Sequence, residues 1–125
     1  MVEGQAGEDT VAGAVEPHPF LAPPPPVAIA HRGGAEEAPE NTLEAFGAAI
    51  ALGYRYLETD AHVTRDGTVV AFHDRTLDRV TDRTGAIAAL SIAEVEAADA
   101  GHAFTLDGGR SFPFRGRGVR VPRLE

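Results

Sequence analysis

The sequence predicts an α/β fold in which short strands pair in parallel. Residues 27–30 (VAIA) form a short apolar run, residues 41–53 (NTLEAFGAAIALG) show the apolar spacing of a helix, and residues 54–63 (YRYLETDAHV) alternate like a strand. A strand, a helix and a second strand in this order form a βαβ unit, whose two strands lie parallel through a right-handed crossover. With 125 residues, 43% of them hydrophobic, the chain has enough apolar material for one modest core.

The first strand and the helix carry the clearest local signals. The continuous apolar run at 27–30 is typical of a strand buried on both faces. Asn41 is the expected N-cap of the helix, and Glu44 three residues later completes an arrangement like a capping box. The expected apolar stripe and helix end are Leu43, Phe46, Ile50 and Gly53.

A β-hairpin is expected next along the chain. Asp66-Gly67 is a strong turn signal between the strand at 54–63 and a returning strand at 69–73 (VVAFH). The polar residues 74–85 show no periodicity and predict a long loop.

The last third of the chain reads as a short helix followed by irregular segments. Ser91 and Glu94 predict a capping box, with Gly101 at the helix end. Residues 101–120 are expected to be irregular, and residues 121–125 (VPRLE) are expected to open a further helix, with Pro122 near its start.

Composition excludes several classes of protein. The chain has no cysteine, so disulfides and thiolate metal sites are excluded, and its net charge of −8 argues against a general nucleic-acid binder. No apolar run reaches the roughly 18 residues of a membrane span, so stable membrane insertion is not expected. Residues 1–26, acidic and ending in PPPP, predict a flexible tail without a secretory signal, ahead of a domain at 27–125. A cytoplasmic location is expected.

Two carboxylates share one face of the second predicted strand. Because side chains alternate along a strand, Glu58, Asp60 and His62 point to one side. Carboxylates at this spacing suit a hard cation such as Ca²⁺ or Mg²⁺, whereas burying both without a counter-ion is costly. A solvated polar strand face is the alternative reading of the same residues.

A histidine follows each of two other strands. His31 ends the first strand, with Arg32 beside it, and His73 ends the returning strand. Imidazole exchanges protons near neutral pH, and the guanidinium fork suits a phosphate. With a cation at the paired carboxylates, these groups describe the metal-assisted cleavage of a phosphate ester.

Three stretches together resemble the N-terminal part of the glycerophosphodiester phosphodiesterase family. They are AHRGGAEEAPENTLEAF, YLETDAHVTRDGTVVAFHD and TLDRVTDRTG, which carry the HRG…PENT, E-x-D and HD elements in the order of the family. The resemblance runs from about Val27 to Glu125 and implies a (β/α)₈ TIM barrel, of which only the first units are present here. The implied reaction is hydrolysis of a small-molecule glycerophosphodiester to sn-glycerol 3-phosphate and an alcohol.

The resemblance also implies a role for each candidate residue. His31 and His73 would be the general acid and base, and Arg32 would contact the phosphate. Glu58 and Asp60 would bind the divalent cation, Ca²⁺ or Mg²⁺. Glu40 and Asn41, from the PENT element, are expected to shape the first loop and not to take part in the chemistry.

One departure from the family pattern leaves other readings open. The family carries a third metal carboxylate, in an apolar-Glu-x-Lys strand, that does not occur in this sequence. We therefore expect residues 1–125 alone to be inactive or poorly folded. The alternatives are an inactive truncated fragment and a sphingomyelinase D-like phospholipase of the same fold. We expect the arginine-rich end to be a solvated insert and not a surface that steers phosphate toward the site. Its arginines are Arg110, Arg115, Arg117, Arg120 and Arg123.

Overall fold

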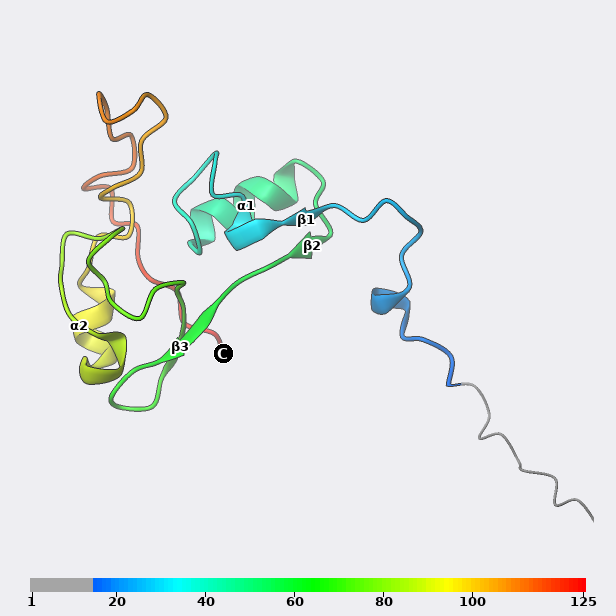
Figure 1. Cartoon of the computed structure of the whole chain (residues 1–125), viewed down its shortest axis with the longest axis horizontal. Coiled ribbons are helices and arrows are strands. Elements are labelled where there is room, and N and C mark those ends of the chain that lie inside the picture. Colours follow the sequence, from blue (N-terminus) through cyan, green and yellow to red (C-terminus); the bar gives the residue numbers. More distant parts are fainter. Residues whose placement is uncertain (1–14) are drawn as a thin grey trace, which may run out of the picture.

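The computed structural model describes residues 15–125, and it contains the predicted βαβ unit (Figure 1). Strands β1 (Ile29–Ala30) and β2 (Tyr56–Leu57) pair in parallel, with Ile29 opposite Tyr56. Helix α1 (Leu43–Ala51) connects them. The parallel pairing confirms the fold class that the helical and strand periodicities predict.

The predicted hairpin is also present, but it starts later than the sequence suggests. Strands β3 (Ala61–Val63) and β4 (Val69–Ala71) pair antiparallel around Gly67, whose φ of 86° suits glycine. The single strand expected at 54–63 is interrupted at residues 58–60. The Glu58 N–H donates to the Ala30 carbonyl and the Asp60 carbonyl accepts from the Phe72 N–H, so this short segment passes from one sheet to the other.

The hydrophobic core lies on the hairpin side of the molecule. The short helices η3 (Ile87–Ala89) and α2 (Ile92–Glu96) contribute to it, and the predicted capping box of Ser91 and Glu94 is confirmed at the start of α2. The buried members of this cluster are Val70, Phe72, Leu77, Ile87, Val95, Ala98, Ala100, Val119 and Val121. The core therefore fixes β4 and the loop that follows it, where His73 lies.

The prediction that residues 121–125 open a helix is wrong, because this segment is extended. The Ala71 N–H donates to the Pro122 carbonyl, and the Leu124 N–H donates to the Val69 carbonyl. Val121 is buried in the core at the same time. Hydrogen bonding to the backbone of β4 and the burial of Val121 therefore decide the conformation of this segment, although Pro122 near its start favours a helix.

Gly101 does not end a helix either. Helix α2 stops at Glu96, with Ala97 as its C-cap. A Cβ at Gly101 would lie 2.6 Å from the Phe114 carbonyl oxygen, so the glycine is needed for a close approach of two segments.

Helix α1 begins one residue later than predicted. Thr42, and not Asn41, is the N-cap, and its Oγ1 accepts from the Ala45 N–H. The Asn41 side chain does not cap the helix, because it accepts a hydrogen bond from the Thr59 hydroxyl and donates one to Asp60. Both residues are good caps, so the tertiary contacts decide between them.

The expected apolar stripe of α1 is also only partly buried. Leu43 is 70% exposed and Ile50 is 60% exposed, whereas Ala45 and Ala49 are buried. Ala45 lies next to Gly33 in the turn η2 (His31–Gly33), so small side chains allow this close packing. Strand β1 likewise alternates and is not buried on both faces, with Ile29 56% exposed and Ala30 buried.

The proline-rich segment contacts β2. In the 3₁₀ turn η1 (Pro19–Leu21), the Phe20 carbonyl accepts from the Tyr56 hydroxyl at 2.7 Å, and the two rings lie 4.8 Å apart. The part of the predicted flexible tail at residues 1–14 lies outside the described residues. No helix within residues 15–125 is long and apolar enough to cross a membrane.

Candidate active site

The five predicted site residues follow the ends of three strands. His31 and Arg32 come directly after β1, Glu58 directly follows β2, and Asp60 lies in the short link between β2 and β3. His73 lies two residues beyond β4. His31 Nε2 lies 3.8 Å from Glu58 Oε2, and Arg32 Nε lies 3.8 Å from Asp60 Oδ2. The parallel pairing of β1 and β2 therefore brings four of the five residues together.

Arg32 occupies a strained turn. Its φ of 52° and ψ of 31° place it in the left-handed region, which costs energy for a side-chain-bearing residue. Gly33 and Gly34 follow with positive φ as well. The Arg32 N–H donates to Glu58 Oε2 at 2.9 Å, and the Arg32 carbonyl accepts from the Asn41 N–H. These bonds hold the turn and direct the His31 and Arg32 side chains to the end of β2.

Glu58 and Asp60 keep one oxygen each for a further ligand. The hydrogen bonds and ion pairs of these two carboxylates reach Glu58 Oε2 and Asp60 Oδ2. Both side chains are partly exposed. Carboxylate oxygens are the ligands that Ca²⁺ and Mg²⁺ prefer, so the donor chemistry fits such an ion. In the described part of the chain, no group of three or more His, Cys, Asp or Glu residues could hold a metal ion, so Glu58 and Asp60 provide two of the ligands that such an ion needs.

The Arg32 guanidinium lies between two acidic side chains. Its Nη1 donates to both Glu40 carboxylate oxygens at 3.4 Å, while its Nε is buried and has no hydrogen-bond partner in the described structure. The sequence predicts that Glu40 shapes the first loop, and in the structure its carboxylate accepts hydrogen bonds from Arg32. The guanidinium charge is therefore shared between Glu40 and Asp60, and Nε keeps an unused hydrogen-bond donor.

His73 is oriented by its neighbours. Its Nδ1 lies 2.7 Å from Asp74 Oδ1, which leaves Nε2 as the ring nitrogen not used in this contact. Its backbone carbonyl contacts His62 Nε2 at 2.9 Å. Alternation along the strand predicts that His62 faces the site, but its ring binds the backbone of the His73 loop.

Asp74 and Arg79 contact His73 directly or through each other, and neither is among the site residues that the sequence predicts. Hydrogen bonds from Arg79 and then from His73 hold the pKa of the Asp74 carboxyl well below its ordinary value. The same pair with Asp74, followed by Glu40, raises the pKa of Arg79. The HD dipeptide is a usable signal for Asp74, but nothing in the aperiodic loop at 74–85 distinguishes Arg79 from its other arginines.

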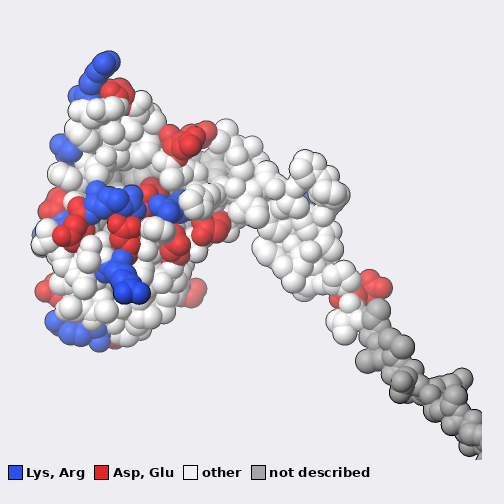
Figure 2. All heavy atoms as spheres, in the orientation of Figure 1, with Lys and Arg blue, Asp and Glu red and all other residues white. Residues whose placement is uncertain are grey.

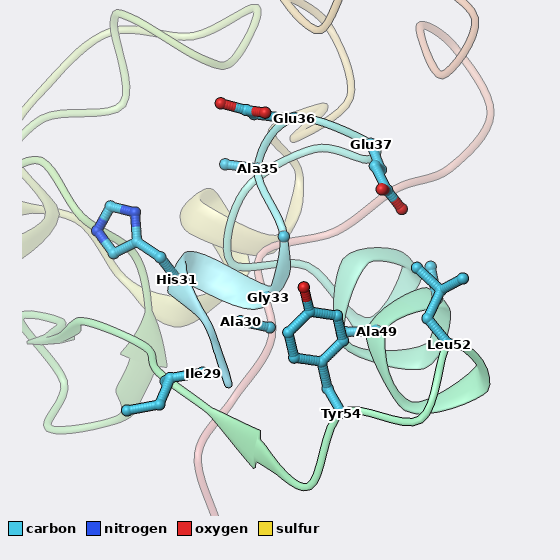
Figure 3. Close-up of a pocket in the computed structure, with 12 residues that line it drawn as sticks. Ile29, Ala30, His31, Gly33, Ala35, Glu36, Glu37, Ala49, Leu52 and Tyr54 are labelled. Carbon is cyan, nitrogen blue, oxygen red and sulfur yellow. The ribbon is translucent and has the colours of Figure 1, made fainter. Parts of the chain in front are cut away.

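Two pockets border the site. The first, of about 240 Å³, lies between the loop after β1 and helix α1. Figure 3 shows that the Tyr54 hydroxyl points toward Gly33, whereas the His31 ring points away from Tyr54. The second, of about 520 Å³, adjoins Glu40 and Arg79 and is otherwise lined mainly by apolar side chains, including Phe104 and Leu106. Figure 2 shows acidic and basic side chains interspersed on the face that it presents.

The arginine-rich end makes local structural contacts. Arg123 pairs with Glu96, and Arg120 donates to the Glu96 carbonyl. Arg115 donates to the His102 carbonyl and stacks on the Phe112 ring at 3.6 Å. These contacts favour an ordered insert over a surface that steers phosphate.

Comparison with known proteins agrees with this arrangement. The sequence profile of the Glycerophosphoryl diester phosphodiesterase family matches residues 31–125. A glycerophosphodiester phosphodiesterase from Caldanaerobacter subterraneus is 40% identical over 96 residues, which cover 77% of this chain and 36% of the relative. Glycerophosphodiester phosphodiesterase 1 from Homo sapiens is 47% identical over 68 residues, covering 54% of this chain and 20% of that protein. The chain thus spans about a third or less of the length of these relatives.

Solved structures match the same region. The glycerophosphoryl diester phosphodiesterase domain of a Mycobacterium tuberculosis protein superposes with a TM-score of 0.75 at 31% identity, covering 79% of this chain and 37% of that one. A phosphodiesterase from Oleispira antarctica, solved with the product sn-glycerol-3-phosphate, matches with a TM-score of 0.67 at 36% identity over the same shares. These neighbours are TIM-barrel proteins, and the βαβ unit described above corresponds to part of such a barrel. The chain belongs to the glycerophosphoryl diester phosphodiesterase family.

Proposed function

We propose that this chain carries the phosphodiester-cleaving site of an enzyme that hydrolyses glycerophosphodiesters to sn-glycerol 3-phosphate and an alcohol. The observation that carries the proposal is the strained turn at Arg32, which places a guanidinium and an imidazole against the Glu58 and Asp60 carboxylates. The product bound to the Oleispira antarctica relative supports the choice of substrate class.

In this proposal, Arg32 binds the phosphate and the two histidines move protons. The Arg32 guanidinium, whose Nε has no hydrogen-bond partner in the described residues, supplies positive charge and N–H donors for a phosphate oxygen. One of His31 and His73 accepts a proton from the attacking oxygen, of water or of the glycerol hydroxyl, as that oxygen bonds to phosphorus. The other donates a proton to the alcohol oxygen as the P–O bond to the alcohol breaks, so charge does not build up on the leaving group. Where the glycerol hydroxyl attacks first, water then opens the cyclic phosphate to give sn-glycerol 3-phosphate.

Glu58 and Asp60 are the residues that would hold a divalent cation, Ca²⁺ or Mg²⁺, through the oxygens not used within the site. Such an ion, when bound, supplies positive charge that offsets the charge of the phosphate oxygens. Without it, the Glu58 and Asp60 carboxylates would repel an anionic substrate, because both are negatively charged and Arg32 offsets only one of the two charges.

Release of sn-glycerol 3-phosphate from sn-glycero-3-phosphocholine tests the proposal. Because residues 1–125 alone are expected to be inactive, they are joined to the C-terminal part of the Caldanaerobacter subterraneus relative that this chain does not match. This fusion protein is compared with its His31→Gln and His73→Gln variants in the presence of Mg²⁺ or Ca²⁺. Loss of a positioned acid or base lowers the rate by about a hundredfold or more. His102→Gln is the matched control, because His102 lies in the insert, away from the strand ends. Equal rates for all four proteins, or no release by the folded fusion protein, would reject the proposal.

A further inference from the structure

Arg79 links the loop that follows η2, which contains Glu40, to the loop that follows β4, which contains Asp74. Its Nε donates to Asp74 Oδ2 at 2.8 Å and its Nη2 donates to Asp74 Oδ1 at 3.0 Å. Its Nη1 donates to Glu40 Oε2 at 3.1 Å, and Nη2 also pairs with Glu40 Oε1. One guanidinium therefore makes two-point contacts with two carboxylates at once.

Each of these carboxylates holds a candidate catalytic side chain. Asp74 Oδ1 lies 2.7 Å from His73 Nδ1, and both Glu40 oxygens lie 3.4 Å from Arg32 Nη1. The charges of these side chains alternate in sign from the Arg32 guanidinium through Glu40 and Arg79 to Asp74, which contacts the His73 ring. Arg79 stands at its centre.

Geometry distinguishes this cluster from an ordinary surface ion pair. A single exposed pair adds little, because solvent screens it and two long side chains must be ordered. Here the Glu40 side chain is only 14% exposed and that of Asp74 only 26% exposed. A planar fork against two carboxylates fixes their orientation as well as their charge, which an ammonium group does not do.

We propose that Arg79 is a positioning residue that fixes the Asp74 carboxylate against His73 Nδ1 and, through Glu40, ties the His73 loop to Arg32. By holding Nδ1 as the protonated nitrogen, this contact leaves His73 Nε2 free to accept or donate a proton at the phosphate. The proposal rests on the proposed function only in taking His73 as an acid or base.

The tautomer of neutral His73 tests the positioning on the 125-residue chain, without any need for turnover. Imidazole ¹⁵N shifts are measured at a pH where the histidines are neutral. In the wild type, His73 is expected to carry its proton on Nδ1. In Arg79→Ala, the Asp74 carboxylate is free to turn toward water, so the share of this tautomer falls toward that of an exposed histidine.

Two further variants separate geometry from charge and from folding. Arg79→Lys keeps the charge but not the fork, so it is expected to lose most of the tautomer preference as well. If Arg79→Ala loses its dispersed amide spectrum, Arg79→Lys carries the test. Arg83→Ala is the matched control, because Arg83 lies in the same loop and its hydrogen bonds there run through its backbone. An unchanged tautomer in the Arg79 variants, or the same fall in Arg83→Ala, would overturn the proposal.

Kinetics tests the consequence for the reaction. If sn-glycerol 3-phosphate is released, Arg79→Ala should lower kcat by about tenfold or more while KM changes little, because His73 acts in the transition state and Arg79 does not touch substrate. Unchanged kcat would overturn the catalytic part of the proposal. These rates are measured on residues 1–125 fused to the unmatched C-terminal part of the Caldanaerobacter subterraneus relative. Absence of release by the folded fusion protein would reject the proposed function, and the tautomer measurement would still decide the positioning role.

Discussion

A methyl group added at Gly33 should destabilise the fold more than the same change at the next residue. Gly33 lies between Arg32 and the first loop, with a φ of 77°. A Cβ at this position would lie 2.6 Å from Phe46 Cδ1, 2.9 Å from Phe46 Cε1 and 3.2 Å from the Ala45 Cβ. Gly33→Ala therefore forces both an unfavourable backbone conformation and an overlap with helix α1.

The two costs can be estimated separately. The left-handed conformation costs an L-residue roughly 1–2 kcal/mol. Overpacking against a ring held by its helix costs about 1–3 kcal/mol. The sum, about 2–5 kcal/mol, is a large share of the roughly 5–15 kcal/mol that stabilises a small domain.

Gly34→Ala isolates the first cost, that of the backbone conformation. Gly34 has a φ of 93°, and a Cβ there meets nothing within 4 Å, so this variant carries only the backbone term. Urea unfolding followed by circular dichroism should give Gly33→Ala a free energy of unfolding about 1–3 kcal/mol lower than that of Gly34→Ala. Equal values for the two variants would refute the close packing of the Arg32 turn on α1.

Three other predictions concern the elements around the site. Thr42→Ala should lower the free energy of unfolding by about 1 kcal/mol because it removes the N-cap of α1, whereas Glu44→Ala should change it by less than about 0.5 kcal/mol; equal losses in urea unfolding would contradict Thr42 as the cap. Gly47→Ala, inside α1 with open space around it, should stabilise the chain by about 0.5–1 kcal/mol in the same assay, and a loss would count against the helix. Hydrogen bonds from Arg79 and then from His73 lower the pKa of Asp74, so its carboxylate stabilises the fold above pH 3.8 and this stabilisation is lost as the pH falls below 3.8. Asp74→Asn should therefore reduce the slope with which the free energy of unfolding falls in that acid range. Identical slopes for the variant and the wild type would contradict the ion pair.

The sequence predicts those parts of the fold that local pattern determines. The βαβ unit, the Asp66-Gly67 turn and the Ser91–Glu94 capping box follow from periodicity and turn chemistry, and the structure contains all three. It does not predict the extended segment at 121–125, where pairing with the backbone of β4 overrides a local helix signal. The choice of Thr42 over Asn41 as the cap also depends on distant partners, Thr59 and Asp60.

The candidate site divides in the same way. His31, Arg32, Glu58 and Asp60 could be placed together from the sequence, because parallel strands bring residues after their carboxyl ends to one edge of the sheet. Arg79 could not, because its partner Glu40 lies 39 residues away and the loop between strand and helix has no periodicity to place it. The left-handed turn at Arg32 was also beyond the sequence pattern, since arginine is an unusual residue for that conformation.

Cation-dependent release of sn-glycerol 3-phosphate tests the central claim most directly. A fusion of residues 1–125 with the unmatched C-terminal part of the Caldanaerobacter subterraneus relative, incubated with sn-glycero-3-phosphocholine and Mg²⁺ or Ca²⁺, should release the product. A chelator should abolish release until the cation is restored. The double variant Glu58→Gln/Asp60→Asn of this fusion should need far more cation for the same rate, because it removes the charges that would hold the ion. Release that neither the chelator nor the double variant affects, or a folded fusion protein that releases no product, would contradict the account.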